Sequence, residues 1–357
     1  MLSSGDRIES VEQMEEVEVA EVVEEQKHVE LPKEVKGIYW TASTAGNYRA
    51  DELTAYMTKM GLNTAVIDLK TDAGSLAFEP EKESLKRYQQ KRLLIKDLDS
   101  VLDKLYEKNI YRIARIPVMR DGVFATNHPD VAMKTEGGGF WRDNIGSVWV
   151  DPASEKVSDY AIELAREAYA RGFDEVQFDY VRFASDGAVS QIRFPIYNGE
   201  ESKVNVMQRF FKKVGTAMKE SSIPSSFDLF GMTYFSHDDF NIGQRLVDVI
   251  SYADFISPMV YPSHYQNGFR GFSNPAENPY QIVKISLDEG VKMMNGIYSG
   301  SEADLRSKSR PWIQDFDIGA VYTAPLIEAQ IKASRDAGAS GWILWNARNV
   351  YEPANYN

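Results

Sequence analysis

An aspartate interrupts one of the most apolar stretches of the sequence. Asp179 lies in EVQFDYVRF (175–183), and Arg115 has a similar place in YRIARIPV (111–118). Burying an unpaired charge costs several kcal/mol, so we expect these two side chains to pair. The guanidinium would keep Asp179 ionised. Such a carboxylate is either part of a structural ion pair or the nucleophile or charge stabiliser of a glycosidase.

A glycosidase also needs a carboxylic acid that protonates the leaving oxygen. Asp315 of PWIQDF (311–316) is our first candidate, and Asp68 of TAVIDLK (64–70) is the second, because both lie where apolar runs end. Each has a structural alternative. Asp315 could order a loop, and Asp68 could pair with Lys70 on the same strand face.

Aromatic and polar side chains also gather where the apolar runs end. Aromatic rings offer flat apolar faces to sugar C–H groups and keep an N–H or O–H for hydroxyls. We therefore predict a carbohydrate-binding set that consists of Trp40, Arg115, Arg182, Tyr261, His264, Trp345 and Asn346. Core packing is the competing interpretation for each tryptophan.

The segments that carry these residues alternate with amphipathic ones. Eight apolar runs have the length of buried strands, at 37–42, 64–70, 111–118, 175–183, 227–235, 254–261, 311–316 and 341–347. Helix patterns lie between them, at 51–60, 98–108, 154–171, 203–220, 241–252, 279–295 and 325–337. Asp51 and Ser154 are expected N-caps. Gly61, Gly172 and Gly338 are expected left-handed residues just past helix ends.

Alternating strands and helices predict a parallel sheet that is covered on both sides. Eight such units in about 320 residues fit a single (β/α)8 TIM barrel. An open doubly wound sheet is the alternative, but no glycine-rich phosphate loop follows the first strand. Long loops follow strand ends at 71–96, 119–153, 185–202 and 262–278, on the C-terminal face where barrels build active sites.

Several of these segments resemble a known family. GFDEVQFDYVRF (172–183) and ISPMVYPSHY (256–265) are similar to the fourth- and sixth-strand motifs of a family of putative glycosyl hydrolase barrels, related to the α-amylase-like glycoside hydrolases. KGIYWTASTAG, AVIDLKTDAG, FGMT and PWIQDF look like the same family. The resemblance implies that Asp179 takes the nucleophile position. Where α-amylase-like enzymes have an arginine two residues earlier, this chain has Gln177, and it lacks their fifth-strand glutamate.

Composition excludes several other kinds of chemistry. The chain has 357 residues, no cysteine and a formal net charge of −13. Without cysteine there are no disulfides, thiol nucleophiles or Cys-bound metals, and the four histidines lack metal-binding spacing. An acidic chain without a basic stripe is a poor nucleic-acid binder. We expect a carbohydrate partner, no metal and no organic cofactor, and the sequence points to no particular protein partner.

Residues 1–35 differ from the rest, with 11 acidic and 3 basic side chains. They predict a disordered acidic low-complexity tail or linker, followed by the barrel at 36–357. No apolar run reaches the ~18–20 residues of a membrane span. The tail and the resemblance favour an extracellular or cell-surface location, although no signal peptide is visible.

The sequence therefore predicts a glycoside hydrolase that cleaves an oligo- or polysaccharide, such as a cell-envelope glycan, with a pair of carboxylates. One alternative is a non-catalytic carbohydrate-binding barrel of the cell envelope, which would lack a second carboxyl group near Asp179. Another is an aldolase or lyase that uses Lys70 as its amine. That enzyme would need Lys70 deep in the barrel mouth with a depressed pKa.

Overall fold

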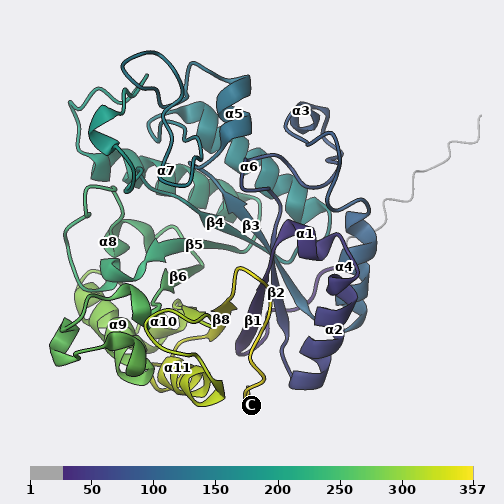
Figure 1. Ribbon diagram of the computed structural model, residues 1–357, viewed down its shortest axis with the longest axis vertical. Helices are drawn as coiled ribbons and strands as arrows, with labels where there is room; N and C mark the ends of the chain where they lie inside the picture. Colours follow the sequence, from purple (N-terminus) through teal and green to yellow (C-terminus); the bar gives the residue numbers. More distant parts are fainter. Residues whose placement is uncertain (1–26, 357) are drawn as a thin grey trace, which may run out of the picture.

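Eight parallel strands close into a barrel that is surrounded by helices (Figure 1). The computed structural model describes residues 27–356. The strands are β1 (Val35–Trp40), β2 (Thr64–Asp68), β3 (Tyr111–Pro117), β4 (Glu175–Asp179), β5 (Ser225–Phe230), β6 (Phe255–Met259), β7 (Trp312–Gln314) and β8 (Gly341–Trp345). Each strand pairs with the next along the chain, and β8 pairs with β1. The predicted (β/α)8 barrel is confirmed, and closure excludes the open sheet.

The helices cover the outside of the barrel. The longer ones are α2 (Arg49–Met60), α4 (Leu98–Glu107), α6 (Glu155–Ala170), α7 (Lys203–Glu220), α9 (Pro279–Met294) and α11 (Ala324–Asp336). The shorter ones are α1 (Ala42–Ala45), α3 (Glu83–Lys86), α5 (Gly122–Asn127), α8 (Leu246–Val249) and α10 (Glu302–Ser307). The three glycines expected past helix ends, Gly61, Gly172 and Gly338, have φ of 71°, 102° and 77°. Ser154 is an N-cap as expected, whereas Asp51 lies in the first turn of a helix that begins at Arg49.

One expected helix, at 241–252, is reduced to the single turn α8. Asn241 and Gly243 are left-handed, with φ of 58° and 77°, and Arg245 is extended. A helix cannot propagate through left-handed or extended residues, so it starts only after Arg245. The amphipathic pattern of 241–252 therefore predicted a longer helix than the structure contains.

The end of the predicted tail lies against the barrel. Val29 is 7% exposed, packs with the side chains inside the barrel, and donates its backbone N–H to Asp174 Oδ1 at 2.7 Å. The ring of His28 stacks on Tyr169, with 4.2 Å between centroids. Residues 1–26 lie outside the described part of the chain, so the predicted tail and its boundary stay a prediction.

Asp174 connects this segment to β3. Arg112 donates to it from Nε at 2.9 Å and from Nη2 at 2.7 Å, and the Arg112 side chain is buried. Asp174→Asn leaves that guanidinium without its counter-charge, so we expect a loss of about 3–5 kcal/mol in the free energy of unfolding, measured with urea. The control is Asp99→Asn, because Asp99 pairs with Arg171 at the surface, where an ion pair contributes about 0–1 kcal/mol. Equal losses in the two variants would contradict the prediction.

Buried polar side chains share the barrel interior with the apolar cluster that contains Val29, below the C-terminal face. Glu175 and Arg310 form a fully buried ion pair at 2.5 Å, and Ser226 donates to the same carboxylate at 2.6 Å. One step closer to the C-terminal face, Gln177 donates to Ser257 Oγ at 3.0 Å. Because these layers are packed, any ligand must enter from the C-terminal end of the strands.

Candidate active site

Arg115 lies at the centre of the barrel mouth and contacts three carboxylates. Nη1 donates to Asp68 Oδ1 at 2.5 Å, and Nη2 donates to Asp179. Nε lies 3.7 Å from Asp228 Oδ2. All four side chains are buried. The expected contact between Asp179 and Arg115 is therefore present, together with two further acids.

The strand register explains why two of these acids are neighbours. Phe178 of β4 pairs with Phe227 of β5. One step further along the same register brings Asp179 level with Asp228, on strands that lie about 4.8 Å apart. Side chains alternate along a strand, so both carboxyl groups face the interior while both phenylalanines face the helices.

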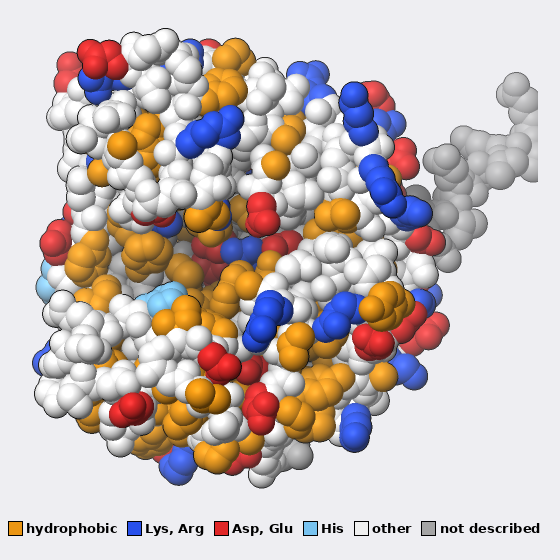
Figure 2. Space-filling model, viewed as in Figure 1, with side chains coloured by type: hydrophobic (Ala, Val, Ile, Leu, Met, Phe, Trp, Pro, Cys, Tyr) orange, Lys and Arg blue, Asp and Glu red, His pale blue; other side chains and the backbone are white. Residues whose placement is uncertain are grey.

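A cavity of about 210 Å³ opens above this cluster, which we call the mouth cavity. It is lined by Arg115, Asp179, Tyr180, Arg182, Asp228, Phe230, Met259, Tyr261, His264, Trp312 and Trp345. Figure 2 shows acidic and basic side chains on the floor of a central hollow, with hydrophobic side chains around them. The volume is below the ~300–1,000 Å³ of common ligand pockets, so it suits about one sugar ring.

The surroundings of Asp228 favour the protonated carboxyl group that a proton donor requires. Burial raises its pKa well above the ordinary value, and the nearby charge of Asp179 raises it further. Trp312 Nε1 donates to Oδ1 at 2.8 Å, whereas Oδ2 has no hydrogen-bond partner among residues 27–356. Asp228 therefore keeps its proton to a higher pH than an exposed aspartate does.

Asp179 has a different environment. It accepts hydrogen bonds from Arg115 and, at 2.5 Å, from the backbone N–H of Tyr180. Tyr180 has a left-handed φ of 52°, which is uncommon for a residue with a side chain and turns the chain immediately after β4. The two neighbouring carboxyl groups are thus surrounded differently, as an acid–base pair requires.

Asp68 lies behind Arg115 and does not line the mouth cavity. The hydroxyl of Tyr39 donates to it, and burial raises its pKa. The alternative pair with Lys70 is not formed. Lys70 is buried against Asp121 and donates to Pro117 O at 2.7 Å, because β2 ends at Asp68 and the strand alternation stops there. Lys70 is therefore outside the mouth cavity, which removes support for the lysine-based alternative.

Four members of the predicted sugar-binding set, besides Arg115, line the cavity: Arg182, Tyr261, His264 and Trp345. The ring of Trp345 stacks on that of Tyr39 at 4.2 Å and lies 5.2 Å from the guanidinium carbon of Arg115. Burial lowers the pKa of His264, which favours the neutral imidazole. The cavity is thus lined by aromatic rings together with two arginines and two aspartates.

Trp40 is not part of the site. It is fully buried, and its side chain belongs to the cluster between the strands and the helices. The side chain that faces the interior is that of the preceding residue, Tyr39, which belongs to the cluster inside the barrel. The placement of Trp40 was wrong because a shift of one residue moves a strand side chain to the opposite face.

Asp315 and Asn346 are also away from the mouth cavity, and they hold the C-terminal segment instead. Asp315 Oδ2 accepts from Glu352 N at 3.2 Å. Asn346 Nδ2 donates to Asp315 O at 2.5 Å and to Val350 O at 2.6 Å. Strand β7 has only three residues and ends at Gln314. Asp315 lies two residues after Ile313, so by strand alternation it shares the outer face on which Ile313 packs. The first candidate for the general acid therefore lies outside the mouth cavity, whereas Asp228 lines it.

Asp315 makes stability depend on pH. Burial raises its pKa to about 7, while an unfolded aspartate titrates near 3.9. The folded state holds the proton more tightly, so this group's stabilisation is full below about pH 4 and is lost as the pH rises through about 7. Asp315→Asn has no carboxyl group to ionise, so it escapes this loss. The urea midpoint of the variant minus that of wild type should therefore be more positive at about pH 8 than at about pH 4. A difference between the two proteins that is the same at both pH values would contradict this.

Sequence reasoning missed Asp228 as a candidate acid. The expected strand 227–235 placed it near a strand start, whereas β5 covers Ser225–Phe230 and a 3-10 turn follows at Gly231–Tyr234. The signal was present: Asp228 interrupts an apolar run in the same way as Asp179 does. Tyr180, Phe230, Met259 and Trp312 were missed as lining residues as well.

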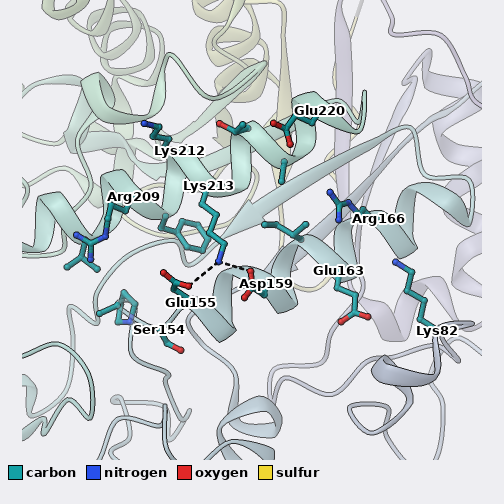
Figure 3. Close-up of a pocket in the computed structure, with 17 residues that line it drawn as sticks. Lys82, Ser154, Glu155, Asp159, Glu163, Arg166, Arg209, Lys212, Lys213 and Glu220 are labelled. Atoms are coloured by element: carbon teal, nitrogen blue, oxygen red, sulfur yellow. Dashed lines mark ion pairs between the residues drawn. The ribbon is translucent and has the colours of Figure 1, made fainter.

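A larger hollow than the mouth cavity lies between α6 and α7 on the outside of the barrel. Its volume is about 930 Å³ (Figure 3). Lys213 of α7 reaches Asp159 of α6 at 2.6 Å and Glu155 at 4.0 Å. These charges pair with one another across the groove and lie on helices rather than at strand ends, so we place no chemistry there.

Two further features concern residues 27–356, the described part of the chain. No group of three or more acidic or histidine side chains in this part of the chain is arranged to hold a metal ion. In the same range, no helix has both the length and the apolar character that crossing a membrane requires.

Comparison with known proteins places the chain in a family. A family described as a putative glycosyl hydrolase domain matches residues 37–351. No curated protein matches the sequence. Among solved structures, the PgaB (BpsB) glycoside hydrolase domain from Bordetella bronchiseptica has a TM-score of 0.59 at 12% identity, covering 87% of this chain and 94% of that one.

Two other structures are similar at the same level. An endo-1,4-beta-D-mannanase from Thermotoga petrophila has a TM-score of 0.55 at 15% identity, covering 87% of this chain and 88% of that one. The spore cortex-lytic enzyme SleL from Bacillus megaterium has a TM-score of 0.53 at 12% identity, covering 93% of this chain and 73% of that one. At such identities the likeness shows a common barrel fold.

Proposed function

The chain belongs to the putative glycosyl hydrolase domain family, and we propose that it hydrolyses glycosidic bonds with the carboxyl pair Asp179 and Asp228. The observation that carries this proposal is the arrangement at the barrel mouth. The two acids are neighbours on adjacent strands and contact the same guanidinium, that of Arg115. Asp179 accepts hydrogen bonds from Arg115 and from the backbone N–H of Tyr180, whereas the pKa of Asp228 is raised by burial and by the charge of Asp179.

In this mechanism Asp228 transfers its proton to the glycosidic oxygen as the bond from that oxygen to the anomeric carbon breaks. The positive charge that develops on the sugar is stabilised by Asp179, either as a carboxylate ion or as a nucleophile that bonds to the anomeric carbon. Water then supplies the hydroxyl group of the new reducing end. Its proton returns to Asp228, which restores the starting state.

Arg115 acts as a positioning residue. Its guanidinium fixes the orientation of Asp179 while Asp68, on its other side, holds Arg115 in place. The aromatic walls at Tyr261 and Trp345 would take the flat faces of the sugar ring. Both features support a carbohydrate ligand.

For the substrate we propose an oligo- or polysaccharide, with bacterial envelope glycans as the first to test. One protein with the same fold is named a spore cortex-lytic enzyme, which supports this choice. The test is the release of reducing ends from a panel of envelope, plant and storage glycans. Wild type should release them from at least one glycan, and the double variant Asp179→Asn/Asp228→Asn from none.

The same panel also tests the alternative of a non-catalytic barrel. If wild type binds a glycan by calorimetry but releases no reducing ends from it, or from any other member of the panel, carbohydrate binding without hydrolysis replaces our proposal. If Asp179→Asn/Asp228→Asn remains active, the site assignment is wrong while the fold stands.

A further inference from the structure

Arg182 is a buried cation in the wall of the mouth cavity. It follows β4, is 5% exposed, and is enclosed by aromatic rings. Its guanidinium carbon lies 4.6 Å from the ring centroid of Phe230, 4.9 Å from that of Trp149 and 5.5 Å from that of Tyr180. Packing against three rings holds the side chain in one orientation.

Only one of its nitrogens is hydrogen bonded. Nη1 donates to Phe183 O and to Ser185 Oγ, both at 3.0 Å. Within residues 27–356, Nε and Nη2 have no hydrogen-bond partner, and they are not among the unpartnered polar atoms that are sealed from solvent. They can therefore be reached by a ligand in the cavity.

The other arginines at the barrel mouth are paired. Arg115 contacts three carboxylates, and Arg120 lies 3.1 Å from Asp143. Arg182 forms no ion pair with a described residue. Burial lowers its pKa, and the nearby carboxylates of Asp179 and Asp186, neither of which is in ion-pair contact with Arg182, only partly oppose this effect. A buried cation without a counter-ion is unfavourable until an anion reaches it.

The free edge of the guanidinium indicates which anion fits. Nε and one N–H of Nη2 point in parallel, and this edge matches the two oxygens of a planar carboxylate. Arg115 does not compete with Arg182 for this carboxylate, because its positive charge is already neutralised by Asp68 and Asp179. Burial raises the pKa of Asp228, which disfavours a further negative charge beside the bound carboxylate.

We propose that the mouth cavity takes a sugar that carries a carboxylate, which Nε and Nη2 of Arg182 bind side-on. This inference rests on the proposed function, because it names the substrate class of the same site. A carboxylate can come from a uronic acid, where it replaces the C6 hydroxymethyl group, or from a lactyl ether on an amino sugar. Both sources present the same planar anion.

The experiment measures binding rather than turnover. The full chain with its native side chains is titrated by calorimetry with matched monosaccharides, which contain no bond between sugars that could be cleaved. The pairs are glucuronate and glucose, galacturonate and galactose, mannuronate and mannose, and N-acetylmuramate and N-acetylglucosamine. We expect at least one acidic sugar to bind about tenfold or more tightly than its neutral partner, as a charge-assisted hydrogen-bonded pair predicts. The pair that shows this preference identifies the source of the carboxylate.

Variants of Arg182 then test the contact. Arg182→Met should abolish the preference, and Arg182→Lys should keep at most a small part of it, because lysine keeps the charge but lacks the planar edge. If Arg182→Met does not fold, Arg182→Lys decides alone. The matched control is Arg270→Met: Arg270 also lies over an aromatic ring, that of Phe235 at 5.7 Å, but does not line the cavity. The preference of Arg270→Met for acidic over neutral sugars should equal that of the protein without this substitution.

The possible outcomes separate this inference from the proposed function. Equal binding of acidic and neutral sugars, or a preference that survives in Arg182→Met, overturns the inference even if wild type hydrolyses glycans. A stronger preference for a sulfated or phosphorylated sugar than for any carboxylate overturns it too. A carboxylate preference that is lost in Arg182→Met supports it even if no glycan is cleaved, in which case only the proposed hydrolysis fails.

Discussion

Asp179→Asn is expected to lower kcat/KM at least about 100-fold on any glycan that wild type cleaves, which corresponds to about 2.7 kcal/mol of lost transition-state stabilisation. The amide keeps the size of the carboxylate but not its charge. Without that charge, the positive character that develops on the sugar has no counter-ion next to the anomeric carbon. Initial rates at several substrate concentrations measure the loss.

The variant also removes one partner of a buried ion pair, so folding must be examined separately. Breaking such a pair can cost about 3–5 kcal/mol of stability. Circular dichroism and retained glycan binding show whether the variant is folded at the assay temperature. The matched control is Asp315→Asn, another buried aspartate at the end of a barrel strand, which should keep its activity within a few-fold. Activity that survives in folded Asp179→Asn would remove Asp179 from the mechanism.

Asp228→Asn is expected to show a loss that depends on the leaving group. On a natural glycan, whose sugar alkoxide must be protonated to leave, we expect at least about a 100-fold fall, within the 10²–10⁴ range for general acid catalysis. On an aryl glycoside with a 2,4-dinitrophenyl group the fall should be much smaller, because that group leaves without a proton. The ratio of the two rates distinguishes a proton donor from a residue that only binds.

The pH profile gives an independent measurement. Burial raises the pKa of Asp228 well above its ordinary value, so its proton is lost at a higher pH than that of an exposed aspartate. Wild type should therefore lose activity on its alkaline side, and Asp228→Asn should lack that limb when assayed with the dinitrophenyl glycoside.

Asp68→Asn is the comparison for Asp228→Asn. Asp68 contacts Arg115 but does not line the cavity, so its removal should affect both kinds of leaving group to the same extent. If Asp228→Asn behaves in this way as well, Asp228 is a positioning residue rather than the acid.

Much of the fold could be predicted from local patterns. Apolar runs of strand length, amphipathic segments between them and glycines such as Gly61 and Gly338 past helix ends all depend on neighbours in sequence. Local signals failed where the chain adopts unusual dihedrals. The stretch at 241–252 is amphipathic, but left-handed Asn241 and Gly243 prevent the helix from starting there. Periodicity does not report such dihedrals.

What the sequence alone determined is the barrel and the central pair. Asp179 and Arg115 interrupt apolar strands, and burying either charge alone would be unfavourable, so their pairing follows from composition and position. The same reasoning applies to Asp228. It was overlooked because the strand was expected to begin at residue 227, which placed Asp228 at the strand's start rather than inside it. Charge inside an apolar run is thus the part of the site that can be recognised without coordinates.

Only the tertiary structure decided which other residues join that pair. Tyr39 faces the interior and Trp40 does not, and Asp228 contacts Arg115 while Asp315 holds the C-terminal segment. These outcomes depend on where each strand starts and ends and on its register with its neighbours, since a shift of one residue reverses the face of every side chain. Register is fixed by the closure of all eight strands, which no single segment encodes.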